Sequence, residues 1–132
     1  MTTVLDASAV VAALIDPGPV GRWAESVLLS GALAAPHLMP VEVANVLRRS
    51  ALAGDVSADV ASMAHAELVT LPVELFPYAP FSSRAWELRQ NVTSYDAWYI
   101  ALAETLGCRL ATLDERLRRA TGLRCDVTTP NA

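Results

Sequence analysis

The sequence predicts an α/β fold in which helices cover the faces of a parallel sheet. Short apolar segments alternate with longer segments whose apolar residues recur at helical spacing. This alternation is typical of parallel sheets, because each strand must be followed by a crossover that is usually a helix. The 132 residues fit one domain, and no linker, repeat or low-complexity stretch divides them. We therefore expect a single domain over residues 1–132.

Turn-forming residues and caps bound the predicted elements in the first half of the chain. Pro17-Gly18-Pro19 ends the first helix, and Pro36 ends the second strand. Gly54 is a C-cap for the third helix, Ser57 is an N-cap for the fourth, and Pro72 stops the fourth. The expected elements are a strand at 3–5, helices at 8–15 and 20–29, a strand at 33–35, and helices at 41–53 and 57–71.

The second half of the chain follows the same alternation. Thr93 or Ser94 caps a strongly predicted helix that Gly107 ends, and Gly122 closes a shorter one. The expected elements are a strand at 73–76, helices at 82–90 and 94–106, a strand at 108–113, a helix at 115–120 and a last strand at 124–128.

Composition excludes several classes of protein. Hydrophobic residues make up 53% of the chain, so it is no disordered tail. The longest apolar runs are too short to span a bilayer, and the first residues lack the basic region of a signal peptide. We therefore expect a cytoplasmic protein without membrane contact, with Cys108 and Cys125 as reduced thiols. So much apolar surface exceeds what one small core hides, which predicts a homodimer and an apolar groove for a partner.

The net charge of −4 at first argues against a nucleic-acid partner. All ten basic residues are Arg, however, and several cluster at 48–49 and 116–119. If four carboxylates gather at one site, the rest of the chain is formally neutral. The acidity is then local chemistry and not a general repulsion of phosphate.

Four acidic residues occupy positions that an α/β fold brings to one edge of its sheet. Asp6 and Asp114 each follow a predicted strand directly, and ligands of parallel sheets bind beyond the carboxyl ends of the strands. Glu42 and Asp96 stand in the first turns of predicted helices, whose amino ends face the same edge. The helix dipole there favours an ionised carboxylate by roughly 0.3–1 kcal/mol. The positions therefore predict that all four side chains lie at this edge.

A cluster of four carboxylates indicates a divalent metal ion. Unpaired carboxylates repel one another, and a hard cation removes that cost. Oxygen ligands without a neighbouring Cys or His favour Mg²⁺ or Mn²⁺ over Zn²⁺, and such a metal can activate water for phosphodiester hydrolysis. From position alone, each residue also fits a helix cap or an ordinary first-turn acid. A shared metal site and four separate structural roles both remain open.

Four local sequences resemble the acidic motifs of PIN domains, in the same order. They are Asp6-Ala7-Ser8 after the first strand, residues 40–49 around Glu42, residues 95–103 around Asp96, and residues 110–117 around Asp114. Their order, their intervals and the chain length are similar to those of VapC-type ribonuclease toxins of bacterial type II toxin–antitoxin modules. The resemblance covers nearly the whole chain.

The resemblance implies a three-layer α/β/α sandwich around a central parallel sheet of four to five short strands. It implies an endoribonuclease that hydrolyses RNA with Mg²⁺ or Mn²⁺, a cognate antitoxin protein and a homodimer. The acidic residues of the family map onto Asp6, Glu42, Asp96 and Asp114. Supporting polar positions map onto Ser8, Asn45 and Thr112.

Two further residues near this edge carry predictions of their own. Arg116 follows Asp114 at the start of a helix, which makes it the best placed arginine for contact with an RNA phosphate. His37 lies shortly before Glu42, where it either approaches the site or serves as an ordinary loop residue.

Three other functional classes share parts of this pattern. A receiver-type signalling domain needs a Lys late in the chain, and this chain has none. A deoxyribonuclease or flap nuclease uses the same metal chemistry, but the short chain lacks elements for threading a flap. A non-catalytic PIN-like module that binds RNA or protein is the main alternative, although none of the four acidic positions that it would lose is missing. The acidic set does not specify which RNA is cut.

Overall fold

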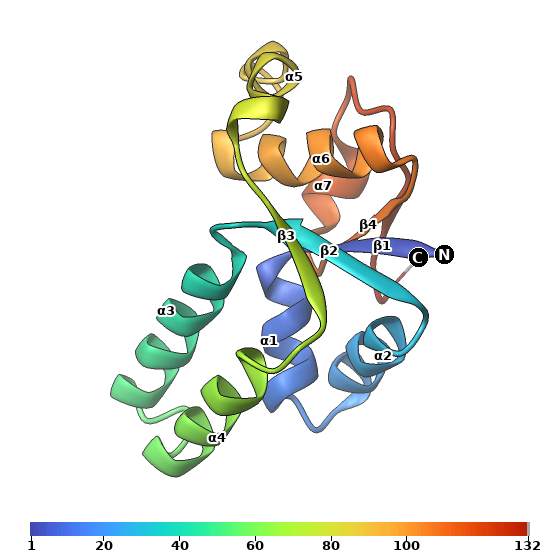
Figure 1. Ribbon diagram of the computed structural model, residues 1–132. Coiled ribbons are helices and arrows are strands. Elements are labelled where there is room, and N and C mark those ends of the chain that lie inside the picture. The colour runs from blue at the N-terminus through green and yellow to red at the C-terminus, as the bar shows by residue number, and fades with distance from the viewer. Residues whose placement is uncertain (132) are drawn as a thin grey trace.

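A parallel sheet of five strands, in the order β3-β2-β1-β4-β5, forms the centre of the molecule (Figure 1). We describe it from a computed structural model, which covers residues 1–131. Each pair of neighbouring strands is parallel, and β1 lies between β2 and β4. The strands are β1 (Thr2–Leu5), β2 (Ala32–Pro36), β3 (Val73–Phe76), β4 (Arg109–Ala111) and β5 (Val127–Thr128).

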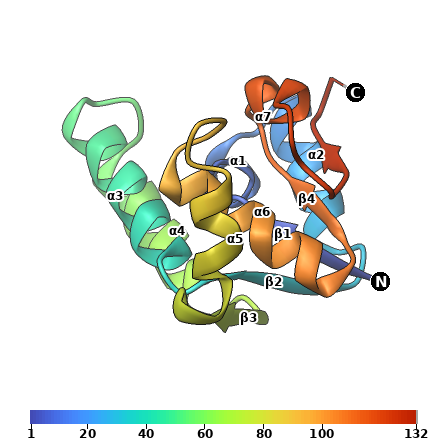
Figure 2. The ribbon, with the colours of Figure 1, turned by 90° about the horizontal axis from the view of Figure 1, so that it is seen from above.

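Helices cover both faces of this sheet, which confirms the three-layer α/β/α arrangement. The helix α6 lies across β1, β2 and β4 on one face with α5 beside it, and α1 and α2 pack together on the other (Figures 1 and 2). The helices α3 and α4 form a pair that packs against α1 and projects away from the sheet. The helices are α1 (Ala7–Ile15), α2 (Pro19–Leu28), α3 (Met39–Leu52), α4 (Ala58–Leu68), α5 (Ser82–Glu87), α6 (Ser94–Leu106) and α7 (Glu115–Arg119), with a short 3₁₀ turn at Ala79–Phe81.

The local signals in the sequence bound these helices as predicted. The Ser57 hydroxyl accepts a hydrogen bond from the backbone N–H of Val60, and the Thr93 hydroxyl accepts one from Asp96. The helix α6 ends at Gly107, whose φ of 64° is the left-handed conformation that glycine adopts without strain. Short-range hydrogen bonding therefore fixes where α4 and α6 begin and where α6 stops.

The core lies on both sides of the central strands. Val4 of β1 and Leu110 of β4 are fully buried, as expected for strands covered by helices on both faces. On α6, Ile100 and Leu102 are also fully buried, so this helix is enclosed on most of its surface. The burial of α6 holds its amino end, and with it Asp96, in a fixed position at the edge of the sheet.

Several predicted boundaries are wrong. The helix α4 ends at Leu68 and not at Leu71, and α3 begins at Met39 and not at Val41. The strand β4 ends at Ala111 and not at Leu113, because Thr112 and Leu113 turn the chain into α7. The last strand is only Val127–Thr128, and α5 stops at Glu87.

Among residues 1–131, no helix is both long and apolar enough to span a bilayer. Cys108 and Cys125 are free and half-buried.

Candidate active site

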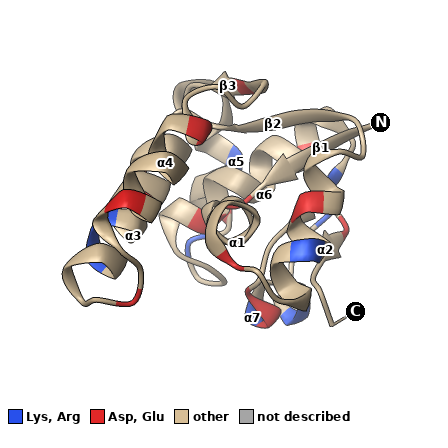
Figure 3. Cartoon of the chain, turned by 90° about the horizontal axis from the view of Figure 1, so that it is seen from below, with Lys and Arg blue, Asp and Glu red and all other residues tan. Residues whose placement is uncertain are grey.

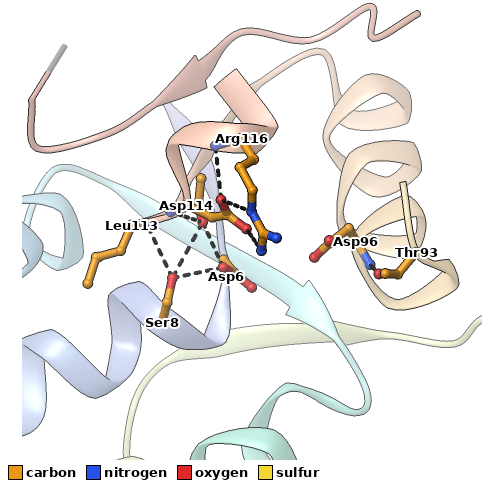
Figure 4. A network of polar contacts seen from close by, with 8 residues as sticks. Asp6, Ser8, Thr93, Asp96, Leu113, Asp114 and Arg116 are labelled. Carbon is orange, nitrogen blue, oxygen red and sulfur yellow. Dashed lines mark hydrogen bonds and ion pairs between the residues drawn. The ribbon is translucent and has the colours of Figure 1, made fainter. Parts of the chain in front are cut away.

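Asp6 lies at the carboxyl end of β1 and caps the helix α1. Its Oδ1 accepts a hydrogen bond of 2.9 Å from the Ala7 backbone N–H. Its Oδ2 accepts a hydrogen bond of 2.8 Å from the Ser8 hydroxyl (Figure 4) and one of 2.7 Å from the Thr112 hydroxyl. Asp6 therefore can both cap α1 and belong to the site, because the cap uses Oδ1 and the two hydroxyls orient Oδ2.

Ser8 and Thr112 connect Asp6 to the chain that leads into α7. The Ser8 hydroxyl accepts a hydrogen bond of 3.1 Å from the Leu113 backbone N–H, and the Thr112 hydroxyl accepts one of 3.1 Å from Asp114. Thr112 is fully buried. The two hydroxyls thus fix the start of α1 relative to the end of β4, although they stand 104 residues apart in the sequence.

Asp96 lies in the first turn of α6, with its carboxylate facing the same edge as Asp6 (Figure 4). Burial raises the pKa of Asp96 above its ordinary value, and the charges of Asp6 and Asp114 raise it further. The Thr93 hydrogen bond and the charge of Arg116 act in the opposite direction. The net shift shows that this carboxylate is incompletely compensated by its neighbours.

Glu42 lies in the first turn of α3 and accepts a hydrogen bond of 2.7 Å on Oε1 from the Tyr99 hydroxyl. Burial raises the pKa of Glu42, the Tyr99 hydrogen bond opposes this, and Asp6 and Asp96 add to the rise. Tyr99 itself is buried, which with its bond to Glu42 holds the pKa of the phenol well above its usual range. The hydroxyl therefore stays protonated and donates to Glu42.

Sequence reasoning did not assign a role to Tyr99. A signal was available, since Tyr99 stands three residues after Asp96, and residues at this spacing share one face of a helix. The structure shows that this face of α6 presents both side chains to the edge of the sheet. Asn45, one turn beyond Glu42 on α3, is exposed, and so is His37 in the turn before α3.

Asp114 is the one acidic residue whose expected placement needs correction. It does not end a strand but caps α7, where its Oδ1 accepts a hydrogen bond of 2.9 Å from the Arg116 backbone N–H. The Arg116 side chain contacts both carboxylate oxygens of Asp114. The hydrogen bond from Arg116 lowers the pKa of Asp114, although burial acts in the opposite direction. Figure 3 shows that α7 carries acidic and basic residues side by side.

The four carboxylates influence one another electrostatically at the carboxyl edge of the sheet. Asp6 acts on both Glu42 and Asp96, and Asp114 acts on Asp96. Within residues 1–131, however, no three Asp, Glu, His or Cys side chains approach closely enough to enclose a metal ion as they stand. Contacts to Tyr99 and Arg116 hold Glu42 and Asp114 in their present positions. The all-oxygen set and the raised pKa values of Glu42 and Asp96 fit Mg²⁺ or Mn²⁺.

A pocket of about 220 Å³ opens beside these carboxylates, between the start of α6 and the helix α7. Its lining includes Asp96, Asp114 and Arg116. A larger pocket of about 550 Å³ lies near Met1, Cys108 and Cys125, at the opposite edge of the sheet. The smaller pocket is the one that adjoins the acidic residues, so size alone does not identify the site.

Comparison with known proteins identifies the family. Residues 3–123 match the PIN domain. The chain is 41% identical to Ribonuclease VapC1 of Mycobacterium tuberculosis over 130 residues, which cover 94% of each chain. It is 38% identical to Ribonuclease VapC9 of the same organism over 125 residues, which cover 95% of each chain.

Solved structures show the same fold at lower identity. A crystal structure of a Pyrobaculum aerophilum protein superposes with a TM-score of 0.72 at 23% identity, over 96% of this chain and 83% of that one. Mycobacterium tuberculosis VapC20, described as a sarcin-ricin loop cleaving toxin, gives a TM-score of 0.68 at 16% identity, over 92% and 95%. From its sequence and its fold together, this chain belongs to the PIN domain family, with the VapC ribonucleases as its close relatives.

Proposed function

We propose that this protein is a metal-dependent endoribonuclease that acts as the toxin of a type II toxin–antitoxin system. The observation that carries the proposal is the gathering of Asp6, Glu42, Asp96 and Asp114 at one edge of the sheet. The raised pKa values of Glu42 and Asp96 indicate carboxylates that lack a full set of compensating partners. The relatives at 38–41% identity are named ribonucleases, which supports the same reaction here. One catalytic domain over residues 1–132 accounts for all of these features.

The four carboxylates would hold Mg²⁺ or Mn²⁺. A divalent ion bound there would neutralise their repulsion, lower the pKa of a water molecule and stabilise charge on the scissile phosphate. Ser8 and Thr112 keep Oδ2 of Asp6 oriented, since both hydroxyls donate to it. The buried Tyr99 hydroxyl orients Glu42 through Oε1, which leaves Oε2 to accept a proton from the attacking water.

The remaining polar residues at this edge bind substrate. Arg116 lines the same pocket as Asp96 and Asp114, and its guanidinium contacts an RNA phosphate when RNA is bound. Asn45 is exposed one turn beyond Glu42, where it contributes a polar contact. Phosphate contacts of this kind position the chain but do not select a base sequence.

The direct test is an RNA cleavage assay with purified protein. Cleavage is expected with Mg²⁺ or Mn²⁺ and is expected to stop with EDTA, leaving 5′-phosphate and 3′-hydroxyl ends. Cleavage at full rate in EDTA, with metal content measured as nil, would overturn the metal-dependent mechanism. Ends carrying 2′,3′-cyclic phosphate would overturn hydrolysis by water. Binding of RNA without cleavage at any metal concentration would favour the alternative, a non-catalytic PIN-like module.

The protein also has surface suited to protein partners. On the projecting pair α3 and α4, Val41, Leu52, Val60 and Met63 are exposed apolar residues. Structures with the same fold include complexes described as VapBC-1 from Haemophilus influenzae and FitAB bound to DNA. We infer a homodimer in the cytoplasm and a cognate antitoxin that silences the ribonuclease. A solution mass near twice 14.1 kDa, and an inactive complex on co-expression with the adjacent small reading frame, are the expected results.

A further inference from the structure

Arg116 contacts the acidic cluster, which we define as Asp6, Glu42, Asp96 and Asp114. The contact is made to Asp114, which caps the helix that carries Arg116. Its Nε lies 3.1 Å from Oδ1 of Asp114, and its Nη2 lies 2.9 Å from Oδ2, so the guanidinium fork contacts both carboxylate oxygens. Figure 4 shows the guanidinium extending from Asp114 toward Asp96. The charge of Arg116 also stabilises the ionised form of Asp96. One cation thus acts on two of the four carboxylates.

The contact is easily reversed. The Arg116 side chain is 84% exposed, and that of Asp114 is 27% exposed. Exposed ion pairs of this kind stabilise a protein only weakly, because water and salt compete for both partners. Arg116 can therefore leave Asp114 at small cost when a stronger ligand for the carboxylate arrives.

The position of Arg116 is specific to the acidic cluster and is not shared by the other arginines of α7. Arg118 pairs with Glu115 three residues earlier on the helix, and Glu115 also binds the Thr129 hydroxyl. Arg119 acts on Asp114 only through its charge, with no hydrogen bond to it among the residues described. Within residues 1–131, only Arg116 contacts both oxygens that Asp114 would offer to a metal ion.

We propose that Arg116 is an internal counter-ion of the acidic cluster, which a divalent cation must displace from Asp114. This inference rests on the proposed metal site and adds a property to it. Without metal, the guanidinium replaces part of the missing positive charge and keeps Asp114 in place. With metal, Asp114 would help to hold the ion, and Arg116 would be free to bind a phosphate group at the pocket that it lines.

The test measures Mn²⁺ affinity and needs no RNA. Free Mn²⁺ is titrated by electron paramagnetic resonance against the wild type and the variants Arg116→Gln, Arg116→Lys and Arg119→Gln. Removing an exposed ion pair predicts about two- to fivefold tighter Mn²⁺ binding by Arg116→Gln. Arg116→Lys keeps the charge but loses the fork, so its affinity should lie between those of the wild type and Arg116→Gln. Arg119→Gln removes a nearby charge without breaking the contact, and its affinity should stay close to that of the wild type.

The outcomes separate this inference from the proposed function. Equal Mn²⁺ affinity in wild type and Arg116→Gln, with binding lost in Asp96→Asn, overturns the counter-ion role and leaves the metal site standing. An equal gain in Arg116→Gln and Arg119→Gln also overturns it, because the effect is then one of general charge. If the wild type binds no Mn²⁺, or if Asp96→Asn binds it equally well, the metal site itself fails and the inference fails with it. A more tightly binding Arg116→Gln, with little change in Arg119→Gln, supports both.

Discussion

The two ends of α6 carry acidic residues in opposite electrostatic situations. Asp96, in the first turn, lies at the carboxyl edge of the sheet, and burial and neighbouring carboxylates raise its pKa. Glu104, in the last turns, lies at the opposite edge, and its pKa is lowered. Burial acts to raise the pKa of Glu104 too, so the difference comes from the partners that each carboxylate has.

Glu104 is compensated by groups from two other parts of the chain. Its Oε1 lies 2.7 Å from Nε of Arg84, and its Oε2 lies 3.1 Å from Nη2 of the same side chain. The backbone N–H of Arg124 donates a further hydrogen bond of 2.7 Å to Oε2. Glu104 thereby ties α5 and the segment before β5 to α6.

The comparison sets a carboxylate that the fold compensates against one on the same helix that we propose to be part of the active site. Glu104 has its partners within the fold and stabilises it. Asp96 faces other carboxylates, and the Thr93 hydrogen bond and the charge of Arg116 do not offset the rise of its pKa. A carboxylate that the fold leaves without full compensation costs stability, and such positions concentrate at functional sites.

The largest expected effect is on RNA cleavage, which a substitution at Asp96 should slow and a substitution at Glu104, at the other end of α6, should not. Asp96→Asn should lower the rate of RNA cleavage by about 100-fold or more, since it removes a proposed metal ligand and its charge. Glu104→Gln should cleave within about threefold of the wild type well below its melting temperature. Single-turnover cleavage with Mn²⁺ measures both. A variant Asp96→Asn that cuts as fast as the wild type would remove Asp96 from the site.

A second variant tests whether the Tyr99 hydroxyl orients the carboxylate of Glu42. Tyr99→Phe removes the hydroxyl that orients Glu42 and should lower the cleavage rate by about tenfold or more, since a hydrogen bond to a charged group contributes about 1.5–3 kcal/mol. The Tyr99 bond lowers the pKa of Glu42, so its loss should move the acid limb of the rate profile to higher pH. Tyr95→Phe, at an exposed position on the same helix, is the matched control and should show neither change. A slower enzyme with an unchanged pH profile would mean that Tyr99 contributes only to packing.

The third prediction compares the two ends of α6 by their effect on folding stability, where Glu104 should matter more than Asp96. Glu104→Gln should lower the free energy of unfolding by about 1–3 kcal/mol, because it weakens charge-assisted hydrogen bonds and leaves Arg84 without its partner. Asp96→Asn, measured by urea denaturation without divalent metal, should show no such loss. Equal destabilisation by the two substitutions would contradict the distinction between the two ends.

The smallest expected effect is a dependence of stability on pH. The pKa of Asp96 is raised on folding, so the folded protein binds its proton at a higher pH than the unfolded chain does. Without metal, its ionisation therefore destabilises the fold as pH rises above about 4, the ordinary range for Asp. Asp96→Asn should melt slightly above the wild type at neutral pH and lose this advantage below about pH 4.

Glu104 should show the opposite dependence. Its pKa is lowered on folding, so its stabilising effect is present above its ordinary pKa and disappears as pH falls through the folded value. The loss of stability caused by Glu104→Gln should thus become smaller in acid. The gain of stability from Asp96→Asn should become smaller as well. Melting temperatures of the wild type and the two variants, measured from about pH 3 to 7, test both predictions. If the two variants differed from the wild type in the same direction at every pH, the opposite pKa shifts of Asp96 and Glu104 would be contradicted.

The sequence by itself determined the order of the elements and the approximate place of the acidic residues. Apolar periodicity and the caps at Ser57, Thr93 and Gly107 act over a few residues, so they can be read without knowledge of the fold. The parallel topology then placed Asp6, Glu42 and Asp96 at one edge, because strand ends and helix starts meet there. Motif order supplied the resemblance to PIN domains.

Only the tertiary structure decided which groups the acidic residues contact. The Tyr99 hydroxyl reaches Glu42 across 57 residues of sequence, and Thr112 reaches Asp6 across 106. Both contacts depend on α6 lying across β1 and β2 and on β4 lying beside β1, and short-range patterns do not specify those neighbours. Asp114 lies at the expected edge, but β4 stops early, so Asp114 caps α7 and does not follow a strand directly. The side-chain contact of Arg116 depends on a choice among rotamers. Pairing over long distances and side-chain conformation are settled by packing, and packing is a property of the whole chain.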